Sequence, residues 1–299
     1  MVTSRQAIDY NTLRSLLFVP TLNDKFIDTA HTRGAHAIIL DLEDAIASDQ
    51  KAHAREALKG AVQRIRLHPA TVLARVNNDP ALLEEDLRAA VFAGVDGVLI
   101  PKVDNSEMLR QSDSLITSFE RQADIEQGAV KTLALIESPM GMFNLREIAQ
   151  ASARLVGLGF GCEDFASCMG IEPTTQALSM PAQQLAMVAR AFNLAALGIP
   201  GSIGDFTDTA GFRQLVLLAK SYGFTGTPGI HPRQITVINE AFHPSAAEIA
   251  HARRVLDAFE QARRRGEGAV ALDGKMIDLP IVERARRTLD AARRGTDAG

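Results

Sequence analysis

The chain has 299 residues, 46% of them hydrophobic, with a formal net charge of −4, so it can bury one large core and has no general attraction to nucleic acid. Its two cysteines, Cys162 and Cys168, are too few for a disulfide framework. The first twenty residues lack the apolar segment of a signal peptide, and no apolar run approaches the length of a membrane span. We therefore expect a cytoplasmic protein with no nucleic-acid or membrane partner.

Short runs rich in Val, Ile and Leu recur along the chain, separated by stretches of helix length. These runs are Ser15–Val19, Ala37–Leu42, Val72–Val76, Gly97–Ile100, Leu133–Ile136, Leu155–Phe160, Ile199–Ile203 and Thr225–Ile230. Their continuous hydrophobicity is typical of parallel strands buried on both faces by helices. One of the intervening stretches, Pro181–Leu197, is predicted to be an amphipathic helix. Eight such alternations predict a (β/α)8 TIM barrel over residues 12–243.

A different pattern follows in residues 244–299. Ser245-Ala-Ala-Glu248 has the form of a capping box and opens a helix. Asp273-Gly274 lies between two short apolar runs, which predicts a hairpin turn. Pro280 fits the first turn of a last helix that ends near Arg294. We expect this C-terminal extension to be an appended hairpin and helix, forming a lid rather than a second domain.

Polar groups follow nearly every predicted strand, where the catalytic residues of such barrels are found. They are Glu43, Asp44, Arg75, Asn77, Lys102, Glu137, Asp164, Asp205 and His231. We interpret His231 as a structural residue, because nothing near it suggests a catalytic triad. Lys102 could form a Schiff base in an aldolase, but a metal site would make that unnecessary.

Glu137 and Asp164 are the candidate metal ligands. Each follows one of two neighbouring predicted strands. Mg²⁺ prefers oxygen ligands and keeps coordination positions for water and substrate, so this pair leaves room for a 2-hydroxy acid to chelate the ion. The alternative is that each carboxylate caps a helix or pairs with a basic neighbour. The pair together favours a Mg²⁺ site, with Glu137 also beside the substrate.

Arg75 offers a planar guanidinium that can bind a carboxylate or a developing oxyanion. Its alternative role is a structural ion pair with Glu43 or Asp44 across neighbouring strand ends. Both roles can hold at once, because acidic neighbours would orient the guanidinium toward a substrate.

Several short motifs resemble those of the citrate lyase beta-subunit-like family in the HpcH/HpaI aldolase/citrate lyase superfamily, close to malyl-CoA and citramalyl-CoA lyases. They are Arg14–Pro20, Leu40–Ala45, Ala74–Asn77, Ile100–Lys102, Ile136–Pro139, Gly161–Phe165, Ile230–Gln234 and Gly274–Asp278. Each motif is short, but their order and number along the chain make the combined match specific.

The resemblance implies a magnesium-dependent carbon–carbon lyase on a (β/α)8 barrel. By motif, Glu137 and Asp164 correspond to the metal ligands, and Arg75 to the substrate-binding arginine. Phe18, in the first motif, is also assigned to substrate binding. Asp278 corresponds to a catalytic aspartate on a C-terminal lid that closes over a neighbouring subunit's site. The family therefore implies a homo-oligomer, a trimer or a multiple of it.

We expect the enzyme to cleave a malyl-CoA- or citramalyl-CoA-type thioester to a 2-oxo acid and acetyl-CoA. The chain departs from the family pattern at Thr21, Asn23, Pro200 and Thr227-Pro228, where a thioester would lie. The acyl carrier therefore stays open. The alternatives are a metal-dependent pyruvate aldolase acting on free hydroxy-oxo acids and a citryl-carrier lyase subunit of a larger complex.

Overall fold

The computed structural model describes residues 8–294, which form two compact units divided between Asn239 and Glu240, within α10 (Pro232–Phe242). Across these described residues, no helix combines the length and apolar character needed to span a bilayer.

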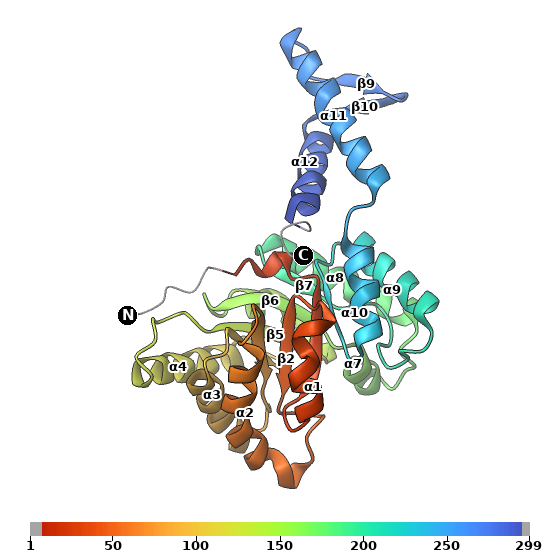
Figure 1. Ribbon diagram of the computed structural model, residues 1–299. Coiled ribbons are helices and arrows are strands. Elements are labelled where there is room, and N and C mark those ends of the chain that lie inside the picture. The colour runs from red at the N-terminus through yellow and green to blue at the C-terminus, as the bar shows by residue number, and fades with distance from the viewer. Residues whose placement is uncertain (1–7, 295–299) are drawn as a thin grey trace. The chain divides into compact units, whose positions relative to one another are not determined.

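The N-terminal unit is built around eight parallel strands (Figure 1). They are β1 (Ser15–Pro20), β2 (Ala37–Asp41), β3 (Thr71–Arg75), β4 (Gly97–Ile100), β5 (Lys131–Ile136), β6 (Leu155–Phe160), β7 (Ala195–Leu197) and β8 (Thr227–Gly229). β1 to β7 pair in sequence order, and β8 pairs with β1. A parallel bridge between Leu197 and Gly226 joins the two ends of the sheet. The prediction of a (β/α)8 barrel is confirmed.

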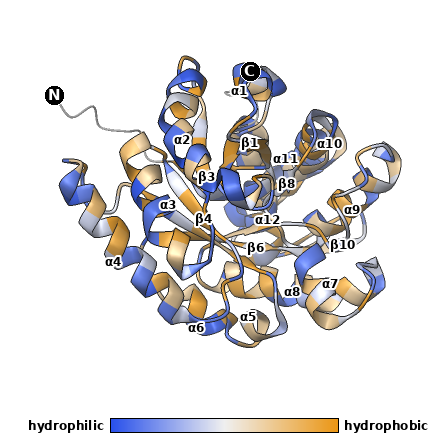
Figure 2. Ribbon diagram, turned by 90° about the horizontal axis from the view of Figure 1, so that it is seen from below, coloured by the Kyte–Doolittle hydropathy of each residue, from blue (hydrophilic) through white to orange (hydrophobic). Residues whose placement is uncertain are grey.

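Helices surround the strands (Figure 2). They are α1 (Asp24–Thr29), α2 (Lys51–Ile65), α3 (Pro80–Ala93), α4 (Ser106–Gln122), α5 (Pro139–Phe143), α6 (Leu145–Ala149), α7 (Cys162–Met169), α8 (Thr175–Ala191), α9 (Thr209–Tyr222) and α10. The strands lie between the surrounding helices and the barrel interior, so they are buried on both faces. This burial explains why the sequences of the strands are continuously apolar.

A cluster of buried side chains fills the barrel interior and includes Leu16, Ile39, Leu73 and Leu133. The short 3-10 helix η1 (Tyr10–Thr12) adds Tyr10 to this cluster. The Tyr10 hydroxyl donates a hydrogen bond to the carbonyl oxygen of Asp96, which precedes β4, at 3.1 Å. η1 therefore packs at the end of the barrel where the strands begin, opposite the end where the predicted site residues lie.

The prediction of a seventh strand over Ile199–Ile203 is wrong, because the strand lies earlier, at Ala195–Leu197. The helix predicted over Pro181–Leu197 accordingly ends at Ala191. Asn193 adopts a left-handed conformation with φ of 57°, which stops the helix and releases the next residues to pair with β6. The strand has the sequence Ala-Ala-Leu, and both residue types favour helices, so it is predicted as the end of the preceding helix. The eighth strand, at Thr227–Gly229, falls inside its predicted range.

The C-terminal unit contains α11 (Ala246–Arg264), the antiparallel strands β9 (Val270–Leu272) and β10 (Lys275–Ile277), and α12 (Leu279–Arg294). The capping box at the start of α11 is present. Asp273 and Gly274 have φ values of 52° and 73°, which suit the two-residue hairpin turn between the strands. The predicted hairpin and helix are confirmed, and their function as a lid stays a prediction.

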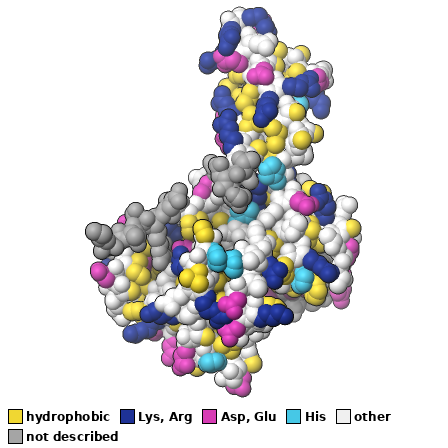
Figure 3. Space-filling model, in the orientation of Figure 1, with side chains coloured by type: hydrophobic (Ala, Val, Ile, Leu, Met, Phe, Trp, Pro, Cys, Tyr) yellow, Lys and Arg dark blue, Asp and Glu magenta, His cyan; other side chains and the backbone are white. Residues whose placement is uncertain are grey.

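The basic side chains of this unit are mixed with acidic ones on its surface (Figure 3). Arg254 pairs with Asp273 at 2.5 Å, and Arg263 pairs with Glu260 at 3.4 Å. Such interleaving of charges is typical of a solvated helix surface.

Candidate active site

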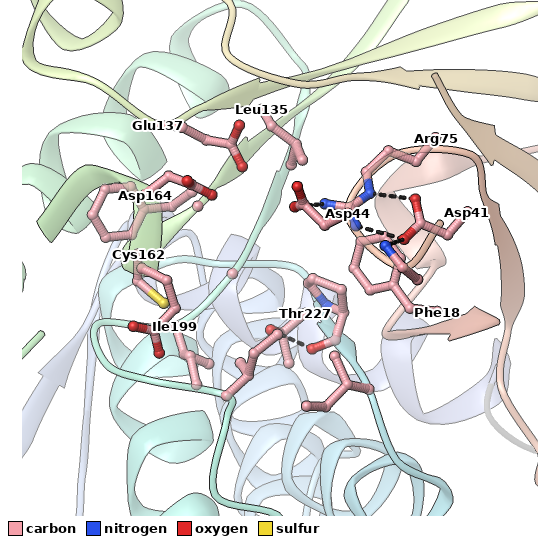
Figure 4. Close-up of a pocket in the computed structure, with 18 of the residues that line it drawn as sticks. Phe18, Asp41, Asp44, Arg75, Leu135, Glu137, Cys162, Asp164, Ile199 and Thr227 are labelled. Carbon is pink, nitrogen blue, oxygen red and sulfur yellow. Dashed lines mark hydrogen bonds and ion pairs between the residues drawn. The ribbon is translucent and has the colours of Figure 1, made fainter. Parts of the chain in front are cut away.

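A pocket of about 440 Å³ is lined by residues from the carboxyl ends of the strands. Glu137 and Asp164 line one side of it, and Arg75 lies on the other side with Asp41 and Asp44 (Figure 4). The structure therefore brings together the two predicted metal ligands and the predicted substrate-binding arginine around one space. The metal and substrate roles of these residues stay predictions.

Glu137 directly follows β5 and is buried. Its Oε2 accepts a hydrogen bond of 2.8 Å from the main-chain N–H of Lys102. Burial raises the pKa of Glu137 to about 7; the negative charge of Asp164 adds to the rise, and the Lys102 N–H opposes it. A cation beside this carboxylate would strongly stabilise its charged form.

The position of Glu137 also depends on a glycine. A Cβ atom on Gly161 would lie 2.4 Å from both Oε1 and Cγ of Glu137. Gly161 directly follows β6 and precedes α7, and its φ of −88° is one that any residue can adopt. Glycine is therefore required at this position by the closeness of Glu137 and not by backbone conformation.

Asp164 lies in the first turn of α7, which begins two residues after β6 ends. Its side chain extends toward the same space as that of Glu137 (Figure 4). Cys162, in the same turn, also lines the pocket. Burial raises the pKa of this thiol to about 12, so it stays protonated and is a poor nucleophile.

Arg75 is the last residue of β3, and three carboxylates surround its guanidinium. Nε and Nη2 donate to the two oxygens of Asp41 at 2.8 and 2.6 Å, while Nη1 lies 3.0 Å from Glu43 and 3.1 Å from Asp44. Burial alone would lower the pKa of Arg75, but the hydrogen bonds and charges of these neighbours raise it above its usual value. The ion pairs with Glu43 and Asp44 considered in the sequence analysis are therefore present.

The strongest partner of Arg75, Asp41, was not identified from the sequence. Asp41 is the last residue of β2 and lies directly beside Arg75 in the register of the two strands. Its side chain is only 2% exposed, and it also accepts hydrogen bonds from the main-chain N–H groups of Glu43 and Ala45. Asp41 therefore fixes both the arginine and the loop that carries the other two carboxylates.

Phe18, on β1, packs against the face of this arginine. The Arg75 Cζ lies 4.7 Å from the centre of the Phe18 ring, a distance typical of a cation–π contact. Phe18 lines the pocket, so the structure places all three residues predicted to bind substrate in the barrel, Phe18, Arg75 and Glu137, around one cavity.

The charges of this region suit a divalent cation. Six carboxylates (Asp41, Glu43, Asp44, Glu137, Glu163 and Asp164) lie in or beside the pocket, together with the cationic side chains of Arg75 and Lys102. The described residues contain no cluster of three or more His, Cys, Asp or Glu side chains arranged to hold a metal. Two protein carboxylates are nevertheless a sufficient anchor for Mg²⁺, which keeps most of its coordination for water and substrate oxygens.

Other predicted strand-end residues lie outside the pocket lining. The Lys102 ammonium is 2.8 Å from Oε1 of Glu43, a hydrogen bond that raises the pKa of Lys102 and opposes a Schiff-base role. His231 stacks on Phe206 with ring centres 4.6 Å apart, consistent with its structural interpretation. Asp205 is exposed and accepts hydrogen bonds within its own loop.

Asp278 belongs to the C-terminal unit, between β10 and α12. Its main-chain carbonyl accepts hydrogen bonds from the N–H groups of Ile281 and Val282, so Asp278 is the residue that caps the start of α12. The neighbouring Met276 and Leu279 are 65% and 58% exposed. The catalytic role of Asp278 stays a prediction.

The remaining pocket wall is mainly apolar. It is formed by Leu135, Phe160, Ile199, Ile203, Thr227, Pro228 and Ile230. Thr227 and Pro228, which depart from the family pattern, thus lie on the pocket itself. The cavity combines an ionic half with an apolar half, a common arrangement for recognising a small acid with a hydrocarbon part.

The family model described as HpcH/HpaI aldolase/citrate lyase matches residues 14–232, which include every strand of the barrel. The chain belongs to this family. The description of the family and the relatives named as citrate lyase subunits confirm the prediction that the protein is a lyase.

The relatives that resemble this chain include proteins named for different activities. Citrate lyase subunit beta of Escherichia coli (strain K12) is 34% identical, with 94% of this chain and 93% of the relative covered. A (3S)-malyl-CoA thioesterase of Cereibacter sphaeroides (strain ATCC 17029 / ATH 2.4.9) is also 34% identical, with 93% and 94% covered.

Among solved structures, CitE of Mycobacterium tuberculosis in complex with magnesium, acetoacetate and coenzyme A is 27% identical. The match has a TM-score of 0.74 and covers 94% of this chain and 98% of CitE. Magnesium thus belongs to the chemistry of this family, as the sequence analysis predicts.

Proposed function

We propose that the protein is a Mg²⁺-dependent lyase that cleaves a 2-hydroxy acid thioester of malyl-CoA or citramalyl-CoA type to a 2-oxo acid and acetyl-CoA. The observation that carries the proposal is the placement of Glu137 and Asp164 opposite Arg75 across one pocket. A bound magnesium and CoA in the similar CitE structure support the choice of metal and of acyl carrier.

Glu137 and Asp164 would hold the metal. Mg²⁺ at this position supplies a Lewis acid that stabilises negative charge on the substrate's hydroxyl and keto oxygens. Arg75, kept charged by its carboxylate neighbours and rigid by Asp41, would orient the carboxylate of the acid unit. The apolar half of the pocket would exclude water from the reacting carbons.

Asp278 would move the proton at the acetyl carbon. Cleavage releases the hydroxyl proton to water, turns the hydroxyl carbon into a keto carbon and leaves the electron pair of the broken carbon–carbon bond on the thioester fragment as an enolate. Protonation of that enolate carbon by the Asp278 carboxylic acid gives acetyl-CoA. We assign Asp278 to the site of a neighbouring copy in a trimer. The trimer and the cytoplasmic location remain predictions.

A second candidate is a citrate lyase beta subunit that acts only on a carrier-bound acyl group. The similarity to the E. coli citrate lyase subunit, which spans nearly the whole of both chains, favours it. Thr227 and Pro228 on the pocket wall also favour an altered acyl carrier, or none, as in an aldolase that acts on free hydroxy-oxo acids.

One assay separates these functions. Purified protein is incubated with Mg²⁺ and, in turn, malyl-CoA, citramalyl-CoA, free hydroxy-oxo acids and a citryl-loaded carrier protein, and products are identified by mass spectrometry. We expect 2-oxo acid and acetyl-CoA from a CoA thioester. Cleavage of free acids alone, or of the carrier-bound acid alone, would overturn the first candidate, and release of free CoA without a 2-oxo acid would indicate a thioesterase.

Matched variants test the metal ligands. Glu137→Gln and Asp164→Asn should each fold and lose Mg²⁺ binding measured by calorimetry. Asp205→Asn removes a carboxylate outside the pocket lining and should bind Mg²⁺ as the parent does. Normal binding by either of the first two variants would refute that ligand assignment, and full activity of the parent in EDTA would refute the metal mechanism.

A further inference from the structure

Lys102 has a backbone conformation that side-chain-bearing residues seldom adopt. It follows β4 and Pro101, and its φ is 52°, in the left-handed region. A strained residue of this kind persists only where its surroundings hold it, and such residues concentrate at functional sites. The hydrogen bonds of Lys102 show which neighbouring groups this conformation brings into contact.

The main chain around Lys102 is fixed on both sides. Its N–H donates to Oε2 of Glu137 at 2.8 Å, and its carbonyl accepts a hydrogen bond of 3.1 Å from the side chain of Asn78. The next residue, Val103, donates its N–H to the carbonyl of Leu135 on β5 at 3.0 Å. The left-handed turn therefore presents its N–H to the carboxylate at the end of the neighbouring strand.

The side chain of Lys102 contacts the other half of the site. Its ammonium lies 2.8 Å from Oε1 of Glu43, and Oε2 of Glu43 lies 3.0 Å from Nη1 of Arg75. Glu43 is buried and lies between these two cations. A single residue thus contacts Glu137 with its main chain and the partner of Arg75 with its side chain.

Lys102 and Glu43 are not among the residues that line the pocket, whereas Glu137 and Arg75, which they contact, do line it. We propose that Lys102 is a positioning residue: its left-handed main chain fixes the Glu137 carboxylate for metal binding, and its ammonium fixes Glu43 and thereby Arg75. The inference rests on the proposed function, because it takes Glu137 as a metal ligand.

Two variants that both remove the Lys102 ammonium distinguish the effect of its main-chain conformation on Mg²⁺ binding from the effect of its side chain. Lys102→Gly removes the ammonium but adopts a φ of 52° freely, whereas Lys102→Val removes it and disfavours that φ strongly. If the left-handed turn positions Glu137, the Val variant should bind Mg²⁺ about tenfold or more weakly than the Gly variant, the loss typical of removing a hydrogen bond to a metal ligand. Calorimetric titration of metal-free protein measures this ratio.

The side-chain contribution has its own measurement. Lys102→Gly should raise KM or lower kcat with little change in Mg²⁺ affinity, because Glu43, one of the three carboxylates that hold Arg75, loses its second cation. Lys102→Arg should recover activity by restoring a cation beside Glu43. Lys59→Met, on the exposed face of α2, is the matched control and should change neither. If Lys102→Val does not fold, Lys102→Ala replaces it, because alanine also disfavours the left-handed region.

The outcomes are distinct. Equal Mg²⁺ affinity of the Gly and Val variants would overturn the main-chain role, and wild-type kinetics of Lys102→Gly would overturn the side-chain role. Glu137→Gln is titrated in the same series. If it bound Mg²⁺ normally, the proposed ligand assignment would fall and the positioning role with it, whereas loss of binding in Glu137→Gln together with equal Gly and Val variants would refute only the role of Lys102.

Discussion

The substitution Gly161→Ala tests the metal site without touching a charged group. The added Cβ would lie 2.4 Å from Cγ and Oε1 of Glu137, whereas carbon–carbon contacts normally lie at roughly 3.5–4.0 Å. Glu137 must therefore move by about 1 Å, while metal–ligand distances tolerate only about 0.2 Å. The shift would also break the hydrogen bond from Lys102.

We expect Gly161→Ala to lower Mg²⁺ affinity by about 10- to 100-fold, which corresponds to about 1.4–2.7 kcal/mol. The fold should survive, because φ of −88° suits alanine and the obstructing atoms belong to a side chain that can turn away. The free energy of unfolding should change by no more than about 1 kcal/mol.

Calorimetric Mg²⁺ titration and urea unfolding measure the two quantities. Gly60→Ala on α2 is the matched control, since a Cβ there would meet nothing within 4 Å. It should leave Mg²⁺ binding unchanged and stabilise the helix by about 0.5–1 kcal/mol. A Gly161→Ala protein with the parent's Mg²⁺ affinity would show that Glu137 is not a ligand, or that its observed position is not the one used.

Three further predictions concern charge and proton transfer. Because the pKa of Glu137 is raised to about 7, protons compete with Mg²⁺, and the apparent affinity should rise with pH through that value in the parent; a flat profile would contradict this. The raised pKa also means that, between pH 4.5 (the ordinary pKa of a glutamate) and about 7, the metal-free native state binds more protons than the unfolded chain. The free energy of unfolding should therefore fall as pH increases through that window, and this fall should be absent in Glu137→Gln. Arg75→Ala strands buried carboxylates and should lower the free energy of unfolding by about 3–5 kcal/mol in urea titrations, with a smaller loss for Arg75→Lys; equal losses would show that a positive charge without the bidentate geometry contributes nothing. Asp278→Asn should fold and bind Mg²⁺ but fail to exchange acetyl-CoA protons with D2O in the presence of a 2-oxo acid, as followed by NMR, and a wild-type exchange rate would reduce Asp278 to a helix-end residue.

The sequence predicted the strands that are continuously apolar and buried on both faces, and it failed where a strand was short and rich in alanine. Ala195–Leu197 has too little β-branched character to be distinguished from the end of a helix. Its position follows from the left-handed Asn193 and from pairing with β6, which are properties of the folded chain.

The residues of the candidate site could likewise be predicted from the sequence only in part. Glu137 and Arg75 could be identified because each stands at the end of an apolar run. Asp41 could not be matched with Arg75, because their contact depends on the register of β2 and β3. The role of Lys102 depends on a φ angle, for which its amino-acid type gives no signal, since left-handed residues are usually Gly or Asn.

The pairing between β7 and β8, which closes the barrel, affects how readily the barrel opens locally. The pairing there amounts to one isolated bridge and a few hydrogen bonds, whereas β5 pairs with both neighbours along most of its length. Sparse pairing favours local opening, so amide hydrogen exchange should be faster along this seam than along β5. Gly198 and Thr227, which flank the seam, belong to the pocket wall, whereas Glu137 extends from β5. We therefore expect the ionic side of the pocket at the end of β5 to be more rigid than the apolar side near β7 and β8.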